Sequence, residues 1–320
     1  MMVNGMTDLI LNLDEASISE IVRRAVEARF ADPEDESDPY RLFHSRRARD
    51  LKHEIVAAGK KLWQRQYVDG NGGNISARIS PQYVICTPTM LSKGDLRPED
   101  LSLVDLENNQ IAGDRPQTSE ISLHLEIYKA VPQAQAVIHC HPPYATAHAV
   151  AGVLPQGNLI PEEEVFIGPV ALAPYETPGT AEFARSVLPM ARHHNTIFLA
   201  NHGIVCWSDT VTHAEWNAEI IDTYCKTSMI ASQLKTPLPE IPPEKIDEIL
   251  AIKRHLGFPD ARLAEERELP QAKGNLVRNP SAAFYFAPSA PSPRPETKVD
   301  IEKLVKSITE ELLKYLEPEG

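Results

Sequence analysis

Apolar residues recur along this chain with two periods. Spacings of three and four residues predict helices, and alternation or short apolar runs predict strands. The predicted helices cover residues 15–30, 118–131, 180–192 and 213–234, with a further helix that starts at Arg46 and stops before the glycine-rich residues 70–73. The predicted strands cover residues 74–79, 83–87, 135–141 and 196–205. Helices and strands that alternate in this way indicate an α/β domain.

The same pattern divides the chain into four parts. An amphipathic helix and the acidic stretch "ADPEDESDP" occupy residues 1–45, and a compact domain is expected over residues 46–270. Residues 271–297 are rich in Pro and Ser and bury too little apolar surface to order themselves, so we interpret them as a linker. Residues 298–320 form a C-terminal amphipathic helix, which Asp300 caps. Its apolar stripe comprises Ile301, Leu304, Val305, Ile308, Leu312 and Leu316.

The net charge, the length of the apolar runs and the cysteine spacing exclude several classes of function. The net charge of −13 argues against a nucleic-acid surface, while a small anion held by amides and hydroxyls stays compatible with it. No apolar run is long enough to cross a bilayer and no signal sequence begins the chain, so we expect no membrane partner and a cytoplasmic protein. The four cysteines lack paired spacing and are predicted to be reduced thiols.

Histidines carry the first chemical signal. His139 and His141 lie two residues apart at the end of a predicted strand, so both rings point to one side while Cys140 points into the core. Zinc prefers about three or four N, O or S ligands. His202, which also follows an apolar strand, is the best candidate for the third. The alternative is that all three are ordinary loop histidines.

Glu120 is the candidate catalytic carboxylate. It is expected in the first turn of the helix over residues 118–131, with His124 one turn later on the same face. The pattern alone favours a simpler role, in which an acidic residue complements the positive end of the helix dipole.

Two segments offer donors for an oxyanion. The loop "GNGGNIS" combines glycines with polar side chains, and Thr118 and Ser119 add hydroxyl and amide donors at a helix N-terminus. Asn-Gly pairs also mark many hairpin turns. Two such segments in one chain are compatible with a phosphate ligand.

In chain order, "GNGGNIS", "TPTMLSKGDL", "TSEISLHLEIY", "AVIHCHPPYATAHA" and "LANHGIV" resemble the class II aldolase/adducin family, and most closely its fuculose- and rhamnulose-1-phosphate aldolases. The resemblance covers about residues 46–235. It implies a three-layer α/β/α sandwich with a central, mostly antiparallel sheet, and a homotetramer with active sites at subunit boundaries.

The resemblance also assigns roles to residues. It implies that His139, His141 and His202 bind Zn²⁺ or another divalent metal, and that Glu120 is the catalytic acid and base. The positions that match the family's phosphate-binding residues are Asn74, Thr89, Thr118 and Ser119. This chain departs from the family at Met90, where glycine is usual, and at Val165 or Phe166, where a tyrosine protonates the aldehyde oxygen.

The expected function is therefore zinc-dependent cleavage of a ketose 1-phosphate to dihydroxyacetone phosphate and an aldehyde such as lactaldehyde. Relatives of this fold also act as pentulose-5-phosphate 4-epimerases or sugar-phosphate dehydratases. A hypothesis from another class is a non-catalytic, adducin-like interaction module, although catalytically inactive members of that kind also lose the zinc histidines.

A linker followed by a short amphipathic helix resembles the peptides that direct enzymes into bacterial microcompartments. Shell proteins are then partners of the C-terminal helix, and confinement suits a lyase that releases a reactive aldehyde. The alternatives are that the C-terminal helix packs on its own tetramer, or that the helix over residues 15–30 is the targeting segment.

Overall fold

The computed structural model describes residues 18–23, 38–258, 260, 262–263 and 301–316. The chain divides into two compact units, one of residues 31–265 and one of residues 1–30 together with 266–320. The predicted linker at 271–297 lies outside the described residues. In the described part of the chain, no helix has the length and apolarity needed to span a bilayer.

The larger unit is built on one eight-stranded sheet with the order β4-β3-β2-β1-β5-β8-β7-β6. All neighbouring strands are antiparallel except β6 and β7. The strands are β1 (Asn74–Arg78), β2 (Tyr83–Cys86), β3 (Ser102–Asp105), β4 (Gln110–Ala112), β5 (Ala136–Cys140), β6 (Ala171–Ala173), β7 (Thr196–Leu199) and β8 (Gly203–Ser208).

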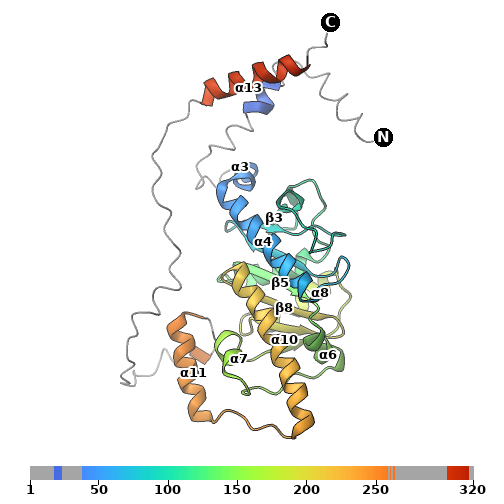
Figure 1. Ribbon diagram of the computed structural model, residues 1–320, viewed down its shortest axis with the longest axis vertical. Coiled ribbons are helices and arrows are strands. Elements are labelled where there is room, and N and C mark those ends of the chain that lie inside the picture. The colour runs from blue at the N-terminus through green and yellow to red at the C-terminus, as the bar shows by residue number, and fades with distance from the viewer. Residues whose placement is uncertain (1–17, 24–37, 259, 261, 264–300, 317–320) are drawn as a thin grey trace. The chain divides into compact units, whose positions relative to one another are not determined.

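Helices cover both faces of this sheet (Figure 1). The helices of this unit are α3 (Pro39–His44), α4 (Arg46–Gln64), the short η1 (Pro98–Asp100), α5 (Ile121–Ala130), α6 (Pro143–Ala151), α7 (Pro161–Phe166), α8 (Ala181–Ser186), α9 (Leu188–Ala191), α10 (Val211–Leu234) and α11 (Pro243–Leu256).

Strand alternation separates two apolar cores. Ile138, Ile204 and Cys206 pack toward α4, α6 and α10, whereas their neighbours Val137 and Val205 pack toward α5, α8 and α9. Successive side chains of a strand point to opposite faces, so each central strand contributes to both cores. The result is the predicted three-layer α/β/α sandwich with a mostly antiparallel sheet.

Two predicted elements were wrong in detail. Residues 196–205 form not one strand but two, β7 and β8, which pair antiparallel across a tight turn. The single helix predicted over residues 180–192 is two short helices, because Pro189 lacks the amide hydrogen that a continuous helix requires.

The smaller unit contains residues 18–23, which are helical, and α13 (Ile301–Leu316), which confirms the predicted C-terminal helix. Ile18, Val22 and Val305 are buried, while Ile308 is exposed. The other apolar residues of the α13 stripe have side chains outside the described set.

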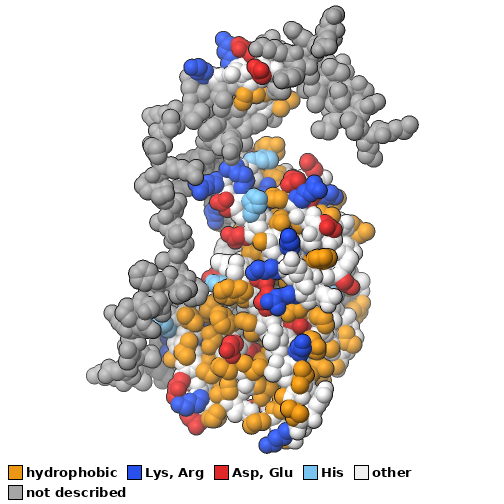
Figure 2. Space-filling model, viewed as in Figure 1, with side chains coloured by type: hydrophobic (Ala, Val, Ile, Leu, Met, Phe, Trp, Pro, Cys, Tyr) orange, Lys and Arg blue, Asp and Glu red, His pale blue; other side chains and the backbone are white. Residues whose placement is uncertain are grey.

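Figure 2 shows apolar side chains gathered on the lower part of the face in view, around α10 and α11. Ile230 and Leu234 on α10 and Ile252 on α11 are exposed. Exposed apolar groups of this size are typical of surfaces that contact another protein.

Candidate metal and acid-base site

The register of two central strands places the first site residues together. β1 and β5 pair antiparallel with Asn74 directly opposite His139. The neighbours Ile75 and Ile138 lie in the core on the α4 side, so Asn74 and His139 point toward the α5 side. Cys140 is buried in the α4-side core, as predicted from its position between the two histidines.

The three predicted histidines form one cluster. One ligand nitrogen from each of His139, His141 and His202 lies within 4.8 Å of the others. His139 and His141 come from the end of β5, and His202 lies in the turn between β7 and β8. In that turn the His202 amide donates to the carbonyl of Leu199 at 3.0 Å, and Asn201 takes a left-handed φ of 55°.

Gly203 permits the close approach of β8 to β5. A Cβ at this position would lie 2.5 Å from the Cys140 carbonyl oxygen and 2.7 Å from Cδ2 of His141. Contacts this short are forbidden to real side chains, so any larger residue would push His141 or the His202 turn away from the cluster.

The imidazoles suit a divalent metal in charge as well as in position. Nδ1 of His139 donates to the carbonyl of Ile204 at 2.8 Å, which leaves Nε2 with a free lone pair. That Nε2 lies 3.1 Å from Nε2 of His141. Burial is the main cause that lowers the pKa of His139 well below 6.5, and it also lowers the pKa of His141 and His202. The three rings are therefore neutral at neutral pH, as metal ligands must be.

Glu120 lies beside this cluster. It is the residue that precedes α5, and its side chain is 13% exposed. Its Oε2 lies 3.4 Å from Nε2 of His139, and its Oε1 lies 3.7 Å from Nε2 of His202. A carboxylate that serves only the helix dipole would face solvent, so this position favours the chemical role over the simpler one.

A chain of buried polar groups orients Glu120. Asn74 donates from Nδ2 to Glu120 Oε2 at 2.7 Å, and its Oδ1 pairs with Nε2 of His124 at 2.6 Å. Nδ1 of His124 pairs with the Ser76 hydroxyl at 2.7 Å, and that hydroxyl also contacts the Tyr128 hydroxyl at 2.9 Å. Burial lowers the pKa of His124 to about 3, so its ring stays neutral. His124 thus acts behind Glu120 and not within the histidine cluster.

The other predicted phosphate residues lie on two segments that meet ahead of α5. The Thr118 amide donates to the carbonyl of Thr87 and the Thr89 amide to that of Pro116, which holds the end of β2 beside the start of α5. Thr118 is buried, Thr89 is half-buried and Ser119 is exposed. Both ends of the Asn74 carboxamide are already bonded to Glu120 and His124, a positioning role that the sequence pattern did not indicate.

The glycine-rich loop and Lys93 complete the neighbourhood. Gly73 adopts a φ of 67°, and a Cβ there would lie 2.9 Å from the carbonyl oxygen of His139. Lys93, which the sequence analysis did not single out, is buried and donates from Nζ to the carbonyls of Asn71 at 3.0 Å and Leu91 at 2.8 Å. A single lysine in a loop gives no pattern from which its contacts with these two carbonyls could be predicted.

The two departures from the family have structural explanations. Met90 has a φ of 56°, the left-handed backbone that explains why glycine is usual there, and its side chain is 77% exposed. Val165 is buried, and the Phe166 ring contacts those of Trp216 and Phe258 at centroid distances of 6.3 and 5.0 Å. Neither Val165 nor Phe166 has a side chain that can donate or accept a proton.

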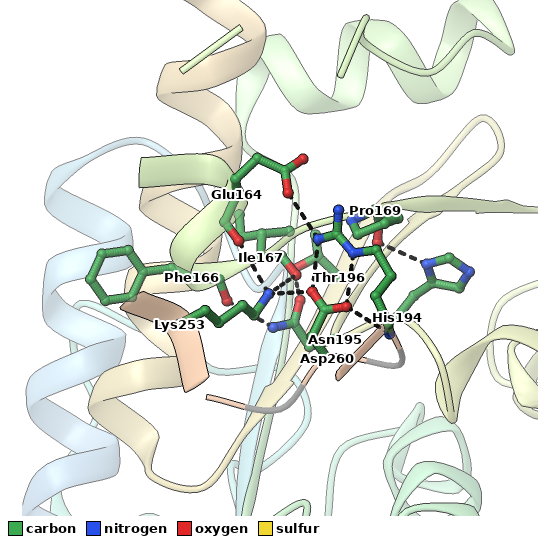
Figure 3. A network of polar contacts seen from close by, with 10 residues as sticks. Glu164, Phe166, Ile167, Pro169, His194, Asn195, Thr196, Lys253 and Asp260 are labelled. Carbon is green, nitrogen blue, oxygen red and sulfur yellow. Dashed lines mark hydrogen bonds and ion pairs between the residues drawn. The ribbon is translucent and has the colours of Figure 1, made fainter. Parts of the chain in front are cut away.

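A second buried polar cluster holds α7 in place (Figure 3). Lys253 of α11 donates to the carbonyls of Glu164 at 3.2 Å and Ile167 at 3.1 Å, and pairs with Asp260 at 2.8 Å. Arg262 pairs with Glu164 and Asp260, each at 2.8 Å. These contacts fix α11, Asp260 and Arg262 against α7 and the loop that follows it.

The α/β/α fold and a histidine cluster beside a carboxylate define the class of protein. Residues 53–229 match the profile of the "Class II Aldolase and Adducin N-terminal domain", more than half of the chain. The chain therefore belongs to the class II aldolase and adducin family, as the sequence motifs predicted.

Curated relatives in this family carry two activities. The chain is 33% identical over 179 residues to the 3-oxo-tetronate 4-phosphate decarboxylase of Haemophilus influenzae, covering 55% of this chain and 85% of that relative. It is 35% identical over 181 residues to the L-fuculose phosphate aldolase of Methanococcus vannielii, covering 57% of this chain and 96% of that relative.

Solved structures show the same fold. YgbL from Escherichia coli superimposes with a TM-score of 0.58 at 28% identity, covering 63% of this chain and 98% of that one. An L-fuculose 1-phosphate aldolase superimposes with a TM-score of 0.58 at 26% identity, covering 65% and 97%.

Proposed function

We propose that this protein is a metal-dependent lyase that breaks a carbon–carbon bond in a phosphorylated keto sugar or keto acid. One observation carries the proposal. Three neutral imidazoles converge within 4.8 Å, and the Glu120 carboxylate lies 3.4 Å from one of them. A purely structural protein of this family has no need of either feature.

His139, His141 and His202 would hold a divalent cation, for which we propose zinc. When bound, it would supply Lewis-acid stabilisation of negative charge on adjacent oxygens. Side chains of the protein perform the proton transfer and bind the phosphate. Glu120 delivers a proton to the carbon atom whose bond to carbon has broken. Asn74 holds the Glu120 side chain in position through a hydrogen bond of 2.7 Å from Nδ2 to Oε2. Thr89, Thr118 and Ser119 supply phosphate donors beside it.

The first candidate reaction is the cleavage of a ketose 1-phosphate of the fuculose or rhamnulose type. The bond between C3 and C4 breaks, the C4 hydroxyl loses its proton and becomes the aldehyde, and C3 gains a proton from Glu120. The products are dihydroxyacetone phosphate and an aldehyde such as lactaldehyde. The 35% identity to an L-fuculose phosphate aldolase supports this candidate.

A specific observation favours a second candidate, the decarboxylation of a 3-oxo acid 4-phosphate. Val165 and Phe166, which stand where the resemblance places the tyrosine of aldolases of this family, are apolar and cannot accept the proton that the C4 hydroxyl loses in cleavage. Loss of CO₂ needs no such proton acceptor. It leaves the same three-carbon phosphate, with one carbon to be protonated by Glu120.

The two candidates share dihydroxyacetone phosphate, so the decisive measurement is the other product. Metal-loaded protein is incubated with fuculose, rhamnulose and ribulose phosphates and with 3-oxo-tetronate 4-phosphate, and aldehyde and CO₂ are assayed alongside metal content. Aldehyde release supports the aldolase and CO₂ release supports the decarboxylase. An epimerised sugar with no free fragment would indicate epimerase chemistry, and absence of both metal and turnover would support the adducin-like module.

We also propose a homotetramer. The exposed apolar side chains of α10 and α11, including Leu234 at 85% exposure, support a subunit contact on that face (Figure 2). Light scattering on the purified full chain measures the assembly. A monomer at micromolar concentration would reject this proposal.

We propose, finally, that a terminal helix addresses the protein to a microcompartment shell. α13 and residues 18–23 belong to one unit separate from residues 31–265, which supports a role apart from catalysis. Residues 298–320 fused to a reporter should co-purify with shell proteins. A fusion of residues 1–45 is tested in parallel. If only that fusion binds shell proteins, the N-terminal segment is the targeting segment, and if neither fusion binds, the targeting proposal is rejected.

A further inference from the structure

Lys93 is a buried cation beside the proposed phosphate site. Its side chain is 2% exposed, and its ammonium group donates to the backbone carbonyls of Asn71 and Leu91. Asn71 lies in the glycine-rich loop, and Leu91 follows Thr89. Lys93 therefore joins the glycine-rich loop to the segment that carries Thr89. A second contact, from Asn71 Nδ2 to Met90 Sδ at 3.4 Å, joins the same two segments.

The partners of Lys93 are neutral. An ammonium group has three N–H donors, and two of them reach carbonyl oxygens. Among the described residues no carboxylate forms an ion pair with Nζ, although Glu120 is near enough to favour its charged form. Burial lowers the pKa of Lys93 to about 8, which leaves the group mostly charged near pH 7. A buried charge without an opposite charge costs free energy, and an anionic ligand would offset that cost.

We propose that Lys93 is the cation of the substrate-anion site, binding the phosphate group electrostatically while it ties the glycine-rich loop to the segment 89–91. This inference rests on the proposed function, because it specifies which charge holds the phosphorylated end of the substrate. Hydroxyls and amides orient a phosphate, but a fixed positive charge is what distinguishes it from a neutral sugar end.

The other donors of the proposed phosphate site support this role. They are hydroxyls and backbone amides, which carry no net charge. Without Lys93 these dipoles alone would hold the charge of a phosphate dianion within the chain.

The test measures binding of inorganic phosphate to the metal-loaded full chain by calorimetry. Lys93→Met should weaken phosphate binding by about tenfold to a hundredfold, the range for one charge-assisted hydrogen bond, while metal content stays unchanged. Lys93→Arg should keep most of the affinity because it keeps the charge. If the Met variant unfolds, Lys93→Gln provides the same comparison with a donor retained.

Lys52 provides a matched control. It is also buried, it also donates to a backbone carbonyl, that of Phe43 at 3.1 Å, and burial also lowers its pKa to about 8. It contacts no residue of the site, so Lys52→Met should leave phosphate affinity unchanged.

Three outcomes would overturn the inference: unchanged affinity in the folded Lys93→Met variant, an equal loss in Lys93→Arg, or no phosphate binding by the wild type. Failure of the proposed reaction is a separate result. A wild type that binds phosphate through Lys93 but cleaves none of the substrates would reject the lyase and retain the anion site.

Discussion

Replacement of Glu120 by glutamine tests the central chemical assignment. The two side chains have nearly the same shape, and the glutamine carbonyl can still accept the hydrogen bond that Asn74 donates at 2.7 Å. The carboxamide cannot transfer a proton at neutral pH. The variant should therefore fold, keep its three imidazoles and lose the proton-transfer step.

The size of the effect follows from that step. General acid-base catalysis by a positioned side chain contributes about 10² to 10⁴ in rate. The expected fall in kcat thus corresponds to about 2.7 to 5.4 kcal/mol of activation free energy. Glu120 is only 13% exposed and contacts two histidines, so a water molecule cannot easily take over its role as proton donor. We therefore expect a fall in kcat near the upper end of this range.

The assay couples dihydroxyacetone phosphate to NADH oxidation, with metal measured on the same sample. Glu126→Gln is the matched control, because Glu126 lies on α5, the helix that Glu120 precedes, and its carboxylate pairs with Lys129 at 3.3 Å and with no other cation among the described residues. Its turnover should equal that of the wild type. Near-normal turnover in Glu120→Gln would remove Glu120 from the mechanism, and loss of the metal would show that Glu120 is a ligand and not only a proton donor.

Four further predictions concern the metal and stability. Gly203→Ala should weaken metal binding at least about tenfold in a chelator competition, because its Cβ would meet the Cys140 carbonyl at 2.5 Å. Removal of the metal by a chelator should lower the Tm, and added zinc should restore it; an unchanged Tm would argue against a folded-state site. The pKa of His124 is 6.5 in the unfolded chain and about 3 in the folded protein. Below pH 6.5 the unfolded chain therefore binds a proton that the folded protein does not, and the contribution of His124 to the free energy of unfolding falls by about 1.4 kcal/mol for each pH unit. Urea unfolding from pH 6.5 to 4.5 should show a slope smaller by that amount in His124→Gln, and equal slopes would contradict the buried neutral ring. Lys253→Met removes one of the two cations that pair with Asp260, together with the hydrogen bonds to the Glu164 and Ile167 carbonyls, while Arg262 still pairs with Asp260. It should lower the free energy of unfolding by about 1 to 3 kcal/mol without loss of metal, which denaturant titration and metal analysis measure together.

Most helices and strands of this fold could be predicted from the spacing of apolar residues that are close together in the sequence. Alternation around residues 136–140 predicts a strand whose His139 and Cys140 point to opposite faces, and the structure confirms both placements. Helical spacing likewise predicted α4, α5 and α10. These predictions succeed because the periods of 2 and 3.6 residues are properties of neighbouring residues.

The tertiary structure decided what no local period can show. The run over residues 196–205 is apolar at both ends, and only the antiparallel pairing of β7 with β8 reveals that the chain reverses at Asn201. The pairing of β8 with β5 then places His202 beside the other two histidines. The Asn-His-Gly sequence was the available turn signal, since asparagine tolerates a positive φ.

The sequence by itself determined the residue types of the histidine cluster, the strand that carries two of them, and the family. Strand register determined that Asn74 faces His139, and loop packing determined that Lys93 reaches Asn71 and Leu91. The physical reason is that a hydrogen bond between residues far apart in the chain depends on how whole elements pack. Residue identity and spacing limit which elements form, whereas the folded arrangement selects which of their polar groups meet.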